Sequence, residues 1–406
     1  MKESASWERT LKILFYRYNS IYEPDCLEAF KKFGIDVVEE RTEVSKKGLE
    51  PGAVVQIVAD HILRQNELND PFLFVFSINF YPAISDICEK LNTLYACWSV
   101  DCPVTELFAN QIKNGHNRVF LFDRTQYERI YRHNPECVYY LPLGTNVERL
   151  DKTNMTINSA DRKKFSSDIS FVGSLYNEKN PLKKMKLSDR TRGFIDGIEN
   201  AQLNIFGMNF IEDVLTDEVV EELKGGKIEK HELLVEPLDH YVAAHAFIGY
   251  DIAEKERILT LNTLAKHFKV DFYTLSDTSD LVGVRNCGPA NSLTEMPKIF
   301  NLSKINLNIT MRPIQTGLSL RVFDVLGSGG FLMTNYQAEI ETMFTPGVDL
   351  EVYGSIDELV DKCAYYLDHE EERKRIALNG YNKVKSMYTV EHRMKQMIGC
   401  MLDGMN

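Results

Sequence analysis

Short apolar runs alternate with amphipathic stretches through the first third of the chain. Runs rich in β-branched and aromatic residues predict strands, and apolar residues spaced three or four apart predict helices between them. The predicted strands are LKILFYRY (11–18), PFLFVFSIN (71–79), LYACWSVD (94–101), NRVFLFD (117–123) and CVYYLPLG (137–144), and the predicted helices are 53–66, 81–92 and 103–114. Strand and helix in repeated alternation predict a parallel sheet with helices on both faces.

The alternation stops over residues 147–166, where large apolar residues are few, and this polar segment is interpreted as a linker or exposed hairpin. It then restarts. A helical, charged stretch at 210–250 is expected between the second and third strands of this second half. The predicted strands are DISFVGSLY (168–176), QLNIFG (202–207), KVDFYTLS (269–276), KINLNIT (304–310), GFLMTNY (330–336) and DLEVYG (349–354), with helices at 254–268, 318–328 and 355–384.

A chain of 406 residues is too long for one ordinary core. We therefore predict an α/β protein with two Rossmann-like domains that face a cleft, in which one lip can hold a nucleotide diphosphate and the other an acceptor, although the fold alone does not make it an enzyme. The predicted parts are a first, acceptor-side domain at 1–147, a linker at 148–167, a second, nucleotide-binding domain at 168–388, and a closing helix at 389–406 that crosses back to the first domain.

The composition narrows the classes of macromolecule that this protein is expected to bind. Hydrophobic residues make up 44% of the chain and the formal net charge is −12, which argues against nucleic acid or an anionic membrane as a main partner. The eight cysteines form no CxxC pair, and no run approaches the roughly 18 apolar residues that span a bilayer. The first residues lack the apolar core of a signal peptide. These features predict a cytoplasmic protein without an integral membrane segment.

The segment MRPIQTGLSLRVFDVLGSGGFLMTNY (311–336) carries the strongest chemical signal. Thr316 and Gly317 follow a predicted strand and open a helix whose first turns carry Arg321 and Asp324. These two residues are three apart and share a face, so a guanidinium and a carboxylate are available to a diphosphate and a ribose. Free amides at Gly317 and Leu318 would add the helix dipole. The alternative is an ordinary intrahelical Arg–Asp pair on the surface.

Polar residues also follow other predicted strands. Gly173 and Ser174 lie near the end of DISFVGSLY, where backbone amides could approach a phosphate, although an ordinary strand-to-helix turn explains them equally well. Asp101 ends YACWSVD and is a candidate base for an acceptor hydroxyl, or else the N-cap of helix 103–114. Tyr18 and Asn19, and Asn79, end two further strands and are acceptor-side candidates.

Long ordered motifs in both halves resemble the CgeB-like (spore maturation protein) glycosyltransferases. In the second half these are RVFDVLGSGGFLMTNYQAEIETMF, DLEVYGSIDELVDKCAYYLDHEEERKRIALNGYNKV and the closing EHRM. In the first half they are FVFSINFYPAISDIC, YACWSVDCPV, RVFLFD and YYLPLGTN. The resemblance covers nearly the whole chain. It implies the GT-B fold and a nucleotide-sugar donor, expected to be a uridine diphosphate (UDP) sugar.

The wider GT-B group carries an E-x7-E pattern on a helix similar to 318–328, and its second Glu binds the donor ribose. Asp324 occupies that second position, whereas Thr316 stands at the first, which leaves the contacts to the donor sugar open. Arg257, in AEKER, matches a further family feature and is a second phosphate-binding or structural arginine.

The resemblance implies a hexosyl- or N-acetylhexosaminyltransferase acting on a hydroxyl, with Ser or Thr of a surface, flagellar or spore protein as the leading acceptor. The chain has no DxD at a strand end, so we expect a reaction without a metal or other cofactor, in which arginine stabilises the leaving diphosphate. The 210–250 stretch either covers a sheet edge or contacts the acceptor. Two other interpretations are a noncatalytic glycan- or protein-binding relative and a sugar-nucleotide epimerase. Arg321, Asp324 and Gly173 favour the enzyme over the first, and the separate acceptor-like first domain of this family argues against the second.

Overall fold

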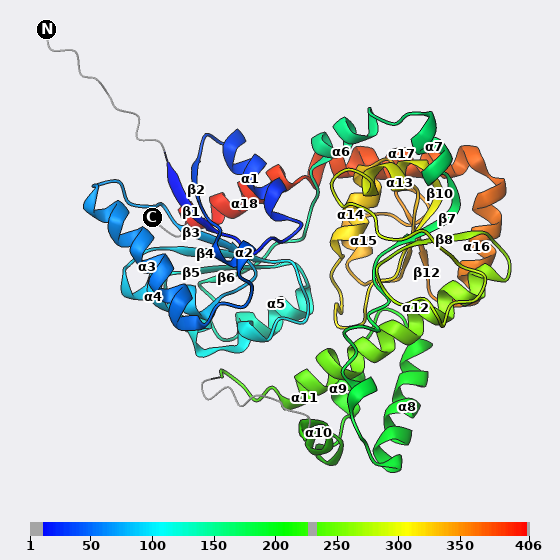
Figure 1. The fold of residues 1–406 in the computed structure, drawn as a ribbon, viewed down its shortest axis with the longest axis horizontal. Helices are drawn as coiled ribbons and strands as arrows, with labels where there is room; N and C mark the ends of the chain where they lie inside the picture. Colours follow the sequence, from blue (N-terminus) through cyan, green and yellow to red (C-terminus); the bar gives the residue numbers. More distant parts are fainter. Residues whose placement is uncertain (1–10, 226–233, 404–406) are drawn as a thin grey trace, which may run out of the picture. The chain divides into compact units, whose positions relative to one another are not determined.

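The computed structural model describes residues 11–225 and 234–403, and their contacts divide the chain into two compact units (Figure 1). The first unit contains the chain up to Leu121, then Tyr127–Leu141, and then the segment that begins at Val390. The second contains Phe122–Gln126 and Pro142–Thr389. Each unit is built around one parallel sheet.

The sheet of the first unit has six strands in the order β2-β1-β3-β4-β5-β6, all parallel. The apolar runs of the sequence form its central strands, and every residue of β3, β4 and β5 is buried. The chain order of the strands reverses between β1 and β3. The strand bounds are β1 Lys12–Tyr16, β2 Asp36–Glu40, β3 Val75–Ile78, β4 Tyr95–Ser99, β5 Asn117–Leu121 and β6 Val138–Tyr140.

Helices connect these strands. Their bounds are α1 Glu23–Lys32, α2 Thr42–Ser45, α3 Pro51–Glu67, α4 Pro82–Lys90 and α5 Arg124–Tyr131. The last helix of the chain, α18 (Val390–Asp403), packs against α1, and Lys32 of α1 pairs with Glu391 of α18. The prediction of a helix over 103–114 is wrong: two short 3-10 turns, η1 (Thr105–Phe108) and η2 (Asn110–Lys113), occupy this segment. Asn117 on β5 donates to the carbonyl oxygens of Gln111 and Ile112, which holds the second turn against the sheet.

The sheet of the second unit also has six parallel strands, in the order β12-β11-β10-β7-β8-β9. The chain order reverses between β7 and β10. The two-residue edge strand β9 was not predicted, because two exposed residues give no periodic signal. The bounds are β7 Ser167–Val172, β8 Val270–Tyr273, β9 Arg285–Asn286, β10 Ser303–Asn308, β11 Leu332–Asn335 and β12 Glu351–Tyr353.

Two sequence predictions for the second half are wrong. The supposed linker at 148–167 forms α6 (Val147–Asn154) and α7 (Ser159–Phe165), since Asn146 and Asn158 cap these helices and a few buried apolar residues pack them against α13. The supposed strand at 202–207 continues the helix α8 (Asp189–Leu203) and then a loop, in which Gln202 donates to the carbonyl oxygens of Ile205 and Met208.

The insertion between β7 and β8 is therefore longer than expected, and the elements described within it are helices joined by loops. It contains η3 (Leu182–Lys184), α8, α9 (Ile211–Val214), α10 (Asp217–Lys224), α11 (Asp239–Tyr241) and the π-helical η4 (Val242–Ile248), which runs directly into α12 (Gly249–Ala265). Part of the predicted 210–250 stretch, residues 226–233, lies outside the described residues.

The insertion has its own hydrophobic cluster, separate from the core of the sheet. Ile195, Ile211, Leu223 and Ile248 belong to the cluster of the insertion, whereas the sheet core contains Phe171, Ile305 and Met333 among others. The helix α12 contributes to both, through Ile252 to the insertion and through Leu261 and Leu264 to the sheet. Figure 1 shows α8 to α11 gathered on one side of the second sheet, with α12 reaching from them to the strands.

The remaining helices of the second unit pack around its sheet. They are α13 (Met296–Leu302), α14 (Leu320–Gly327), α15 (Ile340–Met343), α16 (Ile356–Asp368) and α17 (Glu370–Met387). In the described part of the chain, every helix is too short or too polar to cross a membrane. The predicted α/β class with two parallel sheets is confirmed.

Candidate functional site

In open parallel sheets, ligands bind outside the carboxyl ends of the strands, at the point where the strand order reverses. In the second unit this point lies between β7 and β10. Gly173 and Ser174 follow β7, and the loop from Ile309 to Ser319 leads from β10 to α14. The predicted donor residues therefore belong to segments that leave the sheet at this reversal.

Arg257 of α12 connects the two segments. Its guanidinium donates to the carbonyl oxygen of Ser174 and, at 2.7 Å, to that of Ile309. It also lies 4.5 Å from the centroid of the Tyr176 ring. The residue is buried, and its Nε has no hydrogen-bond partner among the described residues. Arg257 thus fixes both loops and brings a positive charge to the reversal point.

Arg321 lies on the first turn of α14 and has only weak partners in the described structure. Its guanidinium is 3.3 Å from the sulfur of Met296, 5.1 Å from the centroid of Phe300, and 3.9 Å from a carboxylate oxygen of Asp324. Burial lowers the pKa of Arg321, and the nearby Asp324 offsets only part of this effect; the positive charge of Arg257 lowers the pKa further. Arg321 and Arg257 therefore share this region, and among the described residues Asp324 is the carboxylate that lies within 4 Å of the Arg321 guanidinium.

Asp324 lies one turn further along α14 and is buried. One carboxylate oxygen accepts a 2.7 Å hydrogen bond from Thr145, and the other is the oxygen nearest Arg321. The 3.9 Å separation is the intrahelical pair that the sequence offered as an alternative, but its Asp324 is buried and its Arg321 is only partly exposed.

Two of the backbone amides that the sequence predicted to be available for a phosphate already donate hydrogen bonds within the protein. The Gly173 amide donates to the carbonyl oxygen of Tyr273 at 3.1 Å, as part of the sheet. The amides of Thr316 and Gly317 both donate at 2.9 Å to a carboxylate oxygen of Asp123, so a resident carboxylate occupies them. The helix begins only at Leu320, after Ser319, and the side chain of Leu318 is buried.

Three residues of this region escaped the sequence analysis. Asp123 follows the strand β5, which is the same signal that singled out Asp101. Glu339 accepts a 2.7 Å hydrogen bond from the hydroxyl of Thr316, and it therefore brings a carboxylate next to the position where the GT-B pattern has its first Glu. Tyr176 packs its ring against the Arg257 guanidinium, and no spacing in the sequence indicates such a contact.

The first unit places three predicted residues together at the carboxyl ends of β1, β3 and β4, beside the reversal of its strand order. The Asn79 side chain donates to a carboxylate oxygen of Asp101 at 2.7 Å and to the hydroxyl of Tyr18 at 3.1 Å. Burial, and then the charge of Asp101, raise the pKa of Tyr18. Asn19 is exposed and left-handed (φ 75°), and its amide donates to Glu23 at 3.1 Å.

The alternative role of Asp101 as a helix N-cap is wrong. The residue before η1 is Val104, and the turn has no side-chain cap. Asp101 is instead exposed beyond the carboxyl end of β4, where one of its carboxylate oxygens accepts a hydrogen bond from Asn79. A carboxylate in this position can take a proton from a hydroxyl group.

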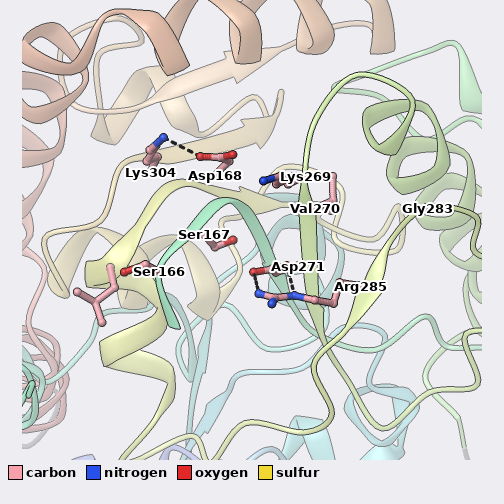
Figure 2. A pocket seen from close by; sticks show the side chains of 10 residues that line it. Ser166, Ser167, Asp168, Lys269, Val270, Asp271, Gly283, Arg285 and Lys304 are labelled. Atoms are coloured by element: carbon pink, nitrogen blue, oxygen red, sulfur yellow. Dashed lines mark hydrogen bonds and ion pairs between the residues drawn. The ribbon is translucent and has the colours of Figure 1, made fainter. Parts of the chain in front are cut away.

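The second unit also contains a cavity of about 580 Å³ at the amino ends of its strands, opposite the end where the donor residues lie (Figure 2). It is lined by residues that begin β7, β8 and β10, and the ion pairs Arg285–Asp271 and Lys304–Asp168 neutralise most of its charges. A second cavity, of about 600 Å³, lies at the carboxyl end of α14 beside α6 and α17. Neither is lined by the predicted donor residues.

Residues 257–399 match a family model described as glycosyl transferase-like. The matched segment begins at Arg257 and includes Arg321 and Asp324. A search of curated proteins returned no match.

Solved structures resemble the whole chain. A glycosyltransferase from Rickettsia africae aligns with a TM-score of 0.52 and 9% identity over 98% of this chain and 99% of its own. Anabaena HepE, solved in complex with UDP-glucose, aligns with a TM-score of 0.52 and 11% identity over 97% of this chain and 100% of its own. Identities this low establish the fold alone, which is GT-B as the sequence resemblance implied.

Proposed function

We propose that this protein is a glycosyltransferase that takes a sugar from a UDP donor bound at the β7–β10 reversal and transfers it to a hydroxyl group. The single observation that carries the proposal is the pair Arg257 and Arg321. Two guanidinium groups lie in the same region, and the nearest carboxylate oxygen to Arg321 is 3.9 Å away. A diphosphate could accept hydrogen bonds from both guanidinium groups, with a charge-assisted geometry that neither has in the described structure.

The roles of the other residues follow from this placement. Asp324 binds the ribose hydroxyls, as the E-x7-E resemblance implies, while Ser174 and the segment from Thr316 to Leu318 shape the loops beside the diphosphate. Arg257 and Arg321 stabilise the leaving UDP, so the reaction needs neither a metal nor another cofactor. Asp101 in the first unit removes the proton of the acceptor hydroxyl.

The UDP donor is supported by the resemblance to CgeB-like glycosyltransferases, and HepE of the same fold was solved with UDP-glucose. The same resemblance favours a hexose or N-acetylhexosamine donor and Ser or Thr of a surface, flagellar or spore protein as the acceptor, modified in the cytoplasm. The alternative is a noncatalytic relative that binds a glycan or protein. The exposed Asp101 carboxylate favours the enzyme, because a binding protein has no need of a base there.

A thermal-shift panel of nucleotides and nucleotide sugars tests the proposal. UDP and a UDP sugar should stabilise the folded protein by mass action, and more than the ADP, GDP and CDP counterparts do. Asp324→Ala should lose that stabilisation, whereas Lys304→Met, at the opposite edge of the same sheet, should keep it. If the whole panel leaves the melting temperature unchanged, the donor site is wrong. Release of UDP from a stabilising donor then separates the enzyme from the binding protein.

A further inference from the structure

The residue Asn79 connects more groups at the edge of the first sheet than a surface asparagine requires. It follows β3 in the left-handed conformation (φ 60°), which asparagine tolerates better than most residues. Its backbone amide donates to the carbonyl oxygen of Trp98 at 2.9 Å, and its own carbonyl accepts from the hydroxyl of Ser77 at 2.7 Å. The backbone of Asn79 is therefore fixed to β3 and β4.

The side-chain amide of Asn79 can face only one way. Its oxygen accepts from the Val100 amide at 3.0 Å and from the Ser99 hydroxyl at 3.4 Å. Its nitrogen uses both hydrogens, one for Asp101 at 2.7 Å and one for Tyr18 at 3.1 Å. Rotation of the amide by half a turn would bring its N–H groups against the N–H of Val100, and its oxygen against the Asp101 carboxylate.

We propose that Asn79 is a positioning residue for Asp101, rather than a residue that contacts the acceptor. It holds one carboxylate oxygen of an otherwise exposed side chain, and it leaves the other oxygen for the proton of the acceptor hydroxyl. Without this bond the carboxylate would exchange among rotamers, and the reactive geometry would be occupied only part of the time. The proposal rests on the proposed function, because it assumes that Asp101 is the base.

Two variants separate the contact from the backbone conformation. Asn79→Gly keeps the left-handed backbone and removes the amide. Asn79→Asp keeps the shape and the acceptor for Val100, but it replaces the donor by a second negative charge beside Asp101. Asn69→Gly is the matched control, because Asn69 is also left-handed (φ 57°) and follows α3, before the amino end of β3. Melting temperature and stabilisation by UDP report whether each variant is folded.

The first measurement needs no substrate. Exposed carboxylates of the full chain are coupled to glycine methyl ester with a water-soluble carbodiimide, and the modification of Asp101 is read by peptide mass spectrometry. Asn79→Gly should raise the rate of carbodiimide coupling at Asp101 several-fold, whereas Asn69→Gly should leave that rate unchanged. Equal rates in the parent and Asn79→Gly would show that Asn79 does not hold the carboxylate, and would overturn the inference.

The second measurement follows UDP released from UDP-glucose with water as the acceptor. Asn79→Gly should lower kcat by roughly tenfold or more and keep the KM for UDP-glucose, because the donor lies in the other unit. Asn79→Asp should move the acid limb of the pH–rate profile to higher pH, since a neighbouring carboxylate disfavours a second negative charge. A parent-like kcat and profile in both variants would overturn the inference.

The outcome for Asp101 itself separates the two proposals. If Asp101→Asn is as active as the parent, or if no UDP sugar that stabilises the parent yields UDP, the proposed function fails. The labelling result then still decides whether Asn79 holds Asp101. If Asp101→Asn is inactive and both Asn79 variants match the parent, only the positioning role fails.

Discussion

The substitution Arg321→Met tests the donor site most directly, because it should separate ligand binding from stability. Methionine keeps the unbranched apolar stem that packs near Met296 and Phe300, and it removes the charge. In the free protein the variant loses a cation–π contact of about 0.5–1 kcal/mol. It also relieves the cost of a partly buried guanidinium near Arg257. We expect the free energy of unfolding without ligand to stay within about 1 kcal/mol of the parent.

The effect on donor binding should be much larger. A hydrogen bond to a charged group contributes about 1.5–3 kcal/mol, so the Kd for UDP should rise roughly 10- to 100-fold. At a UDP concentration of about 100 times the parent Kd, the parent gains about 2.7 kcal/mol of stability. A variant that binds 100-fold more weakly gains only about 0.4 kcal/mol at that concentration.

Chemical denaturation of the parent and variant with and without UDP measures both quantities, and Lys304→Met serves as the control. An unchanged UDP-dependent stabilisation in Arg321→Met would remove Arg321 from the donor site. A loss of more than about 3 kcal/mol without ligand would identify Arg321 as half of a structural ion pair with Asp324, as in a broken buried salt bridge.

Three further predictions concern the reaction and the fold. Asp101→Asn should lower turnover roughly 100-fold or more while UDP binding stays at the parent level, and near-parent turnover would refute the base. Turnover should survive a chelator; activity that vanishes with chelator and returns with magnesium or manganese would show that the arginines do not replace a metal. Burial, and then the neighbouring Asp251, raise the pKa of Glu199 to about 8. Because the folded protein then holds this proton more tightly than the unfolded chain, stability should fall as pH rises from about 5 to 8, by up to about 1.4 kcal/mol for each unit of pKa difference. Glu199→Gln should remove that slope and be more stable than the parent at pH 8.5 in chemical denaturation, and an unchanged slope would contradict this assignment.

The sequence predicted the two sheets because their strands are short apolar runs, which long segments of amphipathic helix separate. The same signal failed at 202–207, where Ile205 and Phe206 suggest a strand, but the Gln202 side chain satisfies the carbonyl groups of a loop. It also failed at 147–166, since only a few apolar residues are needed to bury one face of α6 and α7. Side-chain caps at Asn146 and Asn158 add the stability that these helices gain at their amino ends.

The candidate site was predictable only as far as it depends on strand ends. Tyr18, Asn79 and Asp101 end three neighbouring strands, so their proximity follows from a parallel sheet. The hydrogen bond from Asn79 to Asp101 depends on the left-handed backbone at Asn79. An asparagine after a strand is too common in sequences to predict that conformation. Asp123, far from Gly317 in sequence, occupies an amide that the sequence alone leaves free.

The helix α12 has a consequence for how this protein could change during evolution. One end of this helix is built into the insertion through Ile252, and the other into the sheet core through Leu261 and Leu264, with Arg257 between them. The helices α8 to α10 pack around a hydrophobic cluster separate from the core of the sheet, so residues on their surface can change without disrupting the sheet. A substitution that tilts α12 would move the Arg257 guanidinium away from the carbonyl groups of Ser174 and Ile309. Selection on the donor site therefore constrains α12, together with the loop after β7 that Arg257 holds, more than the helices α8 to α10 of the insertion.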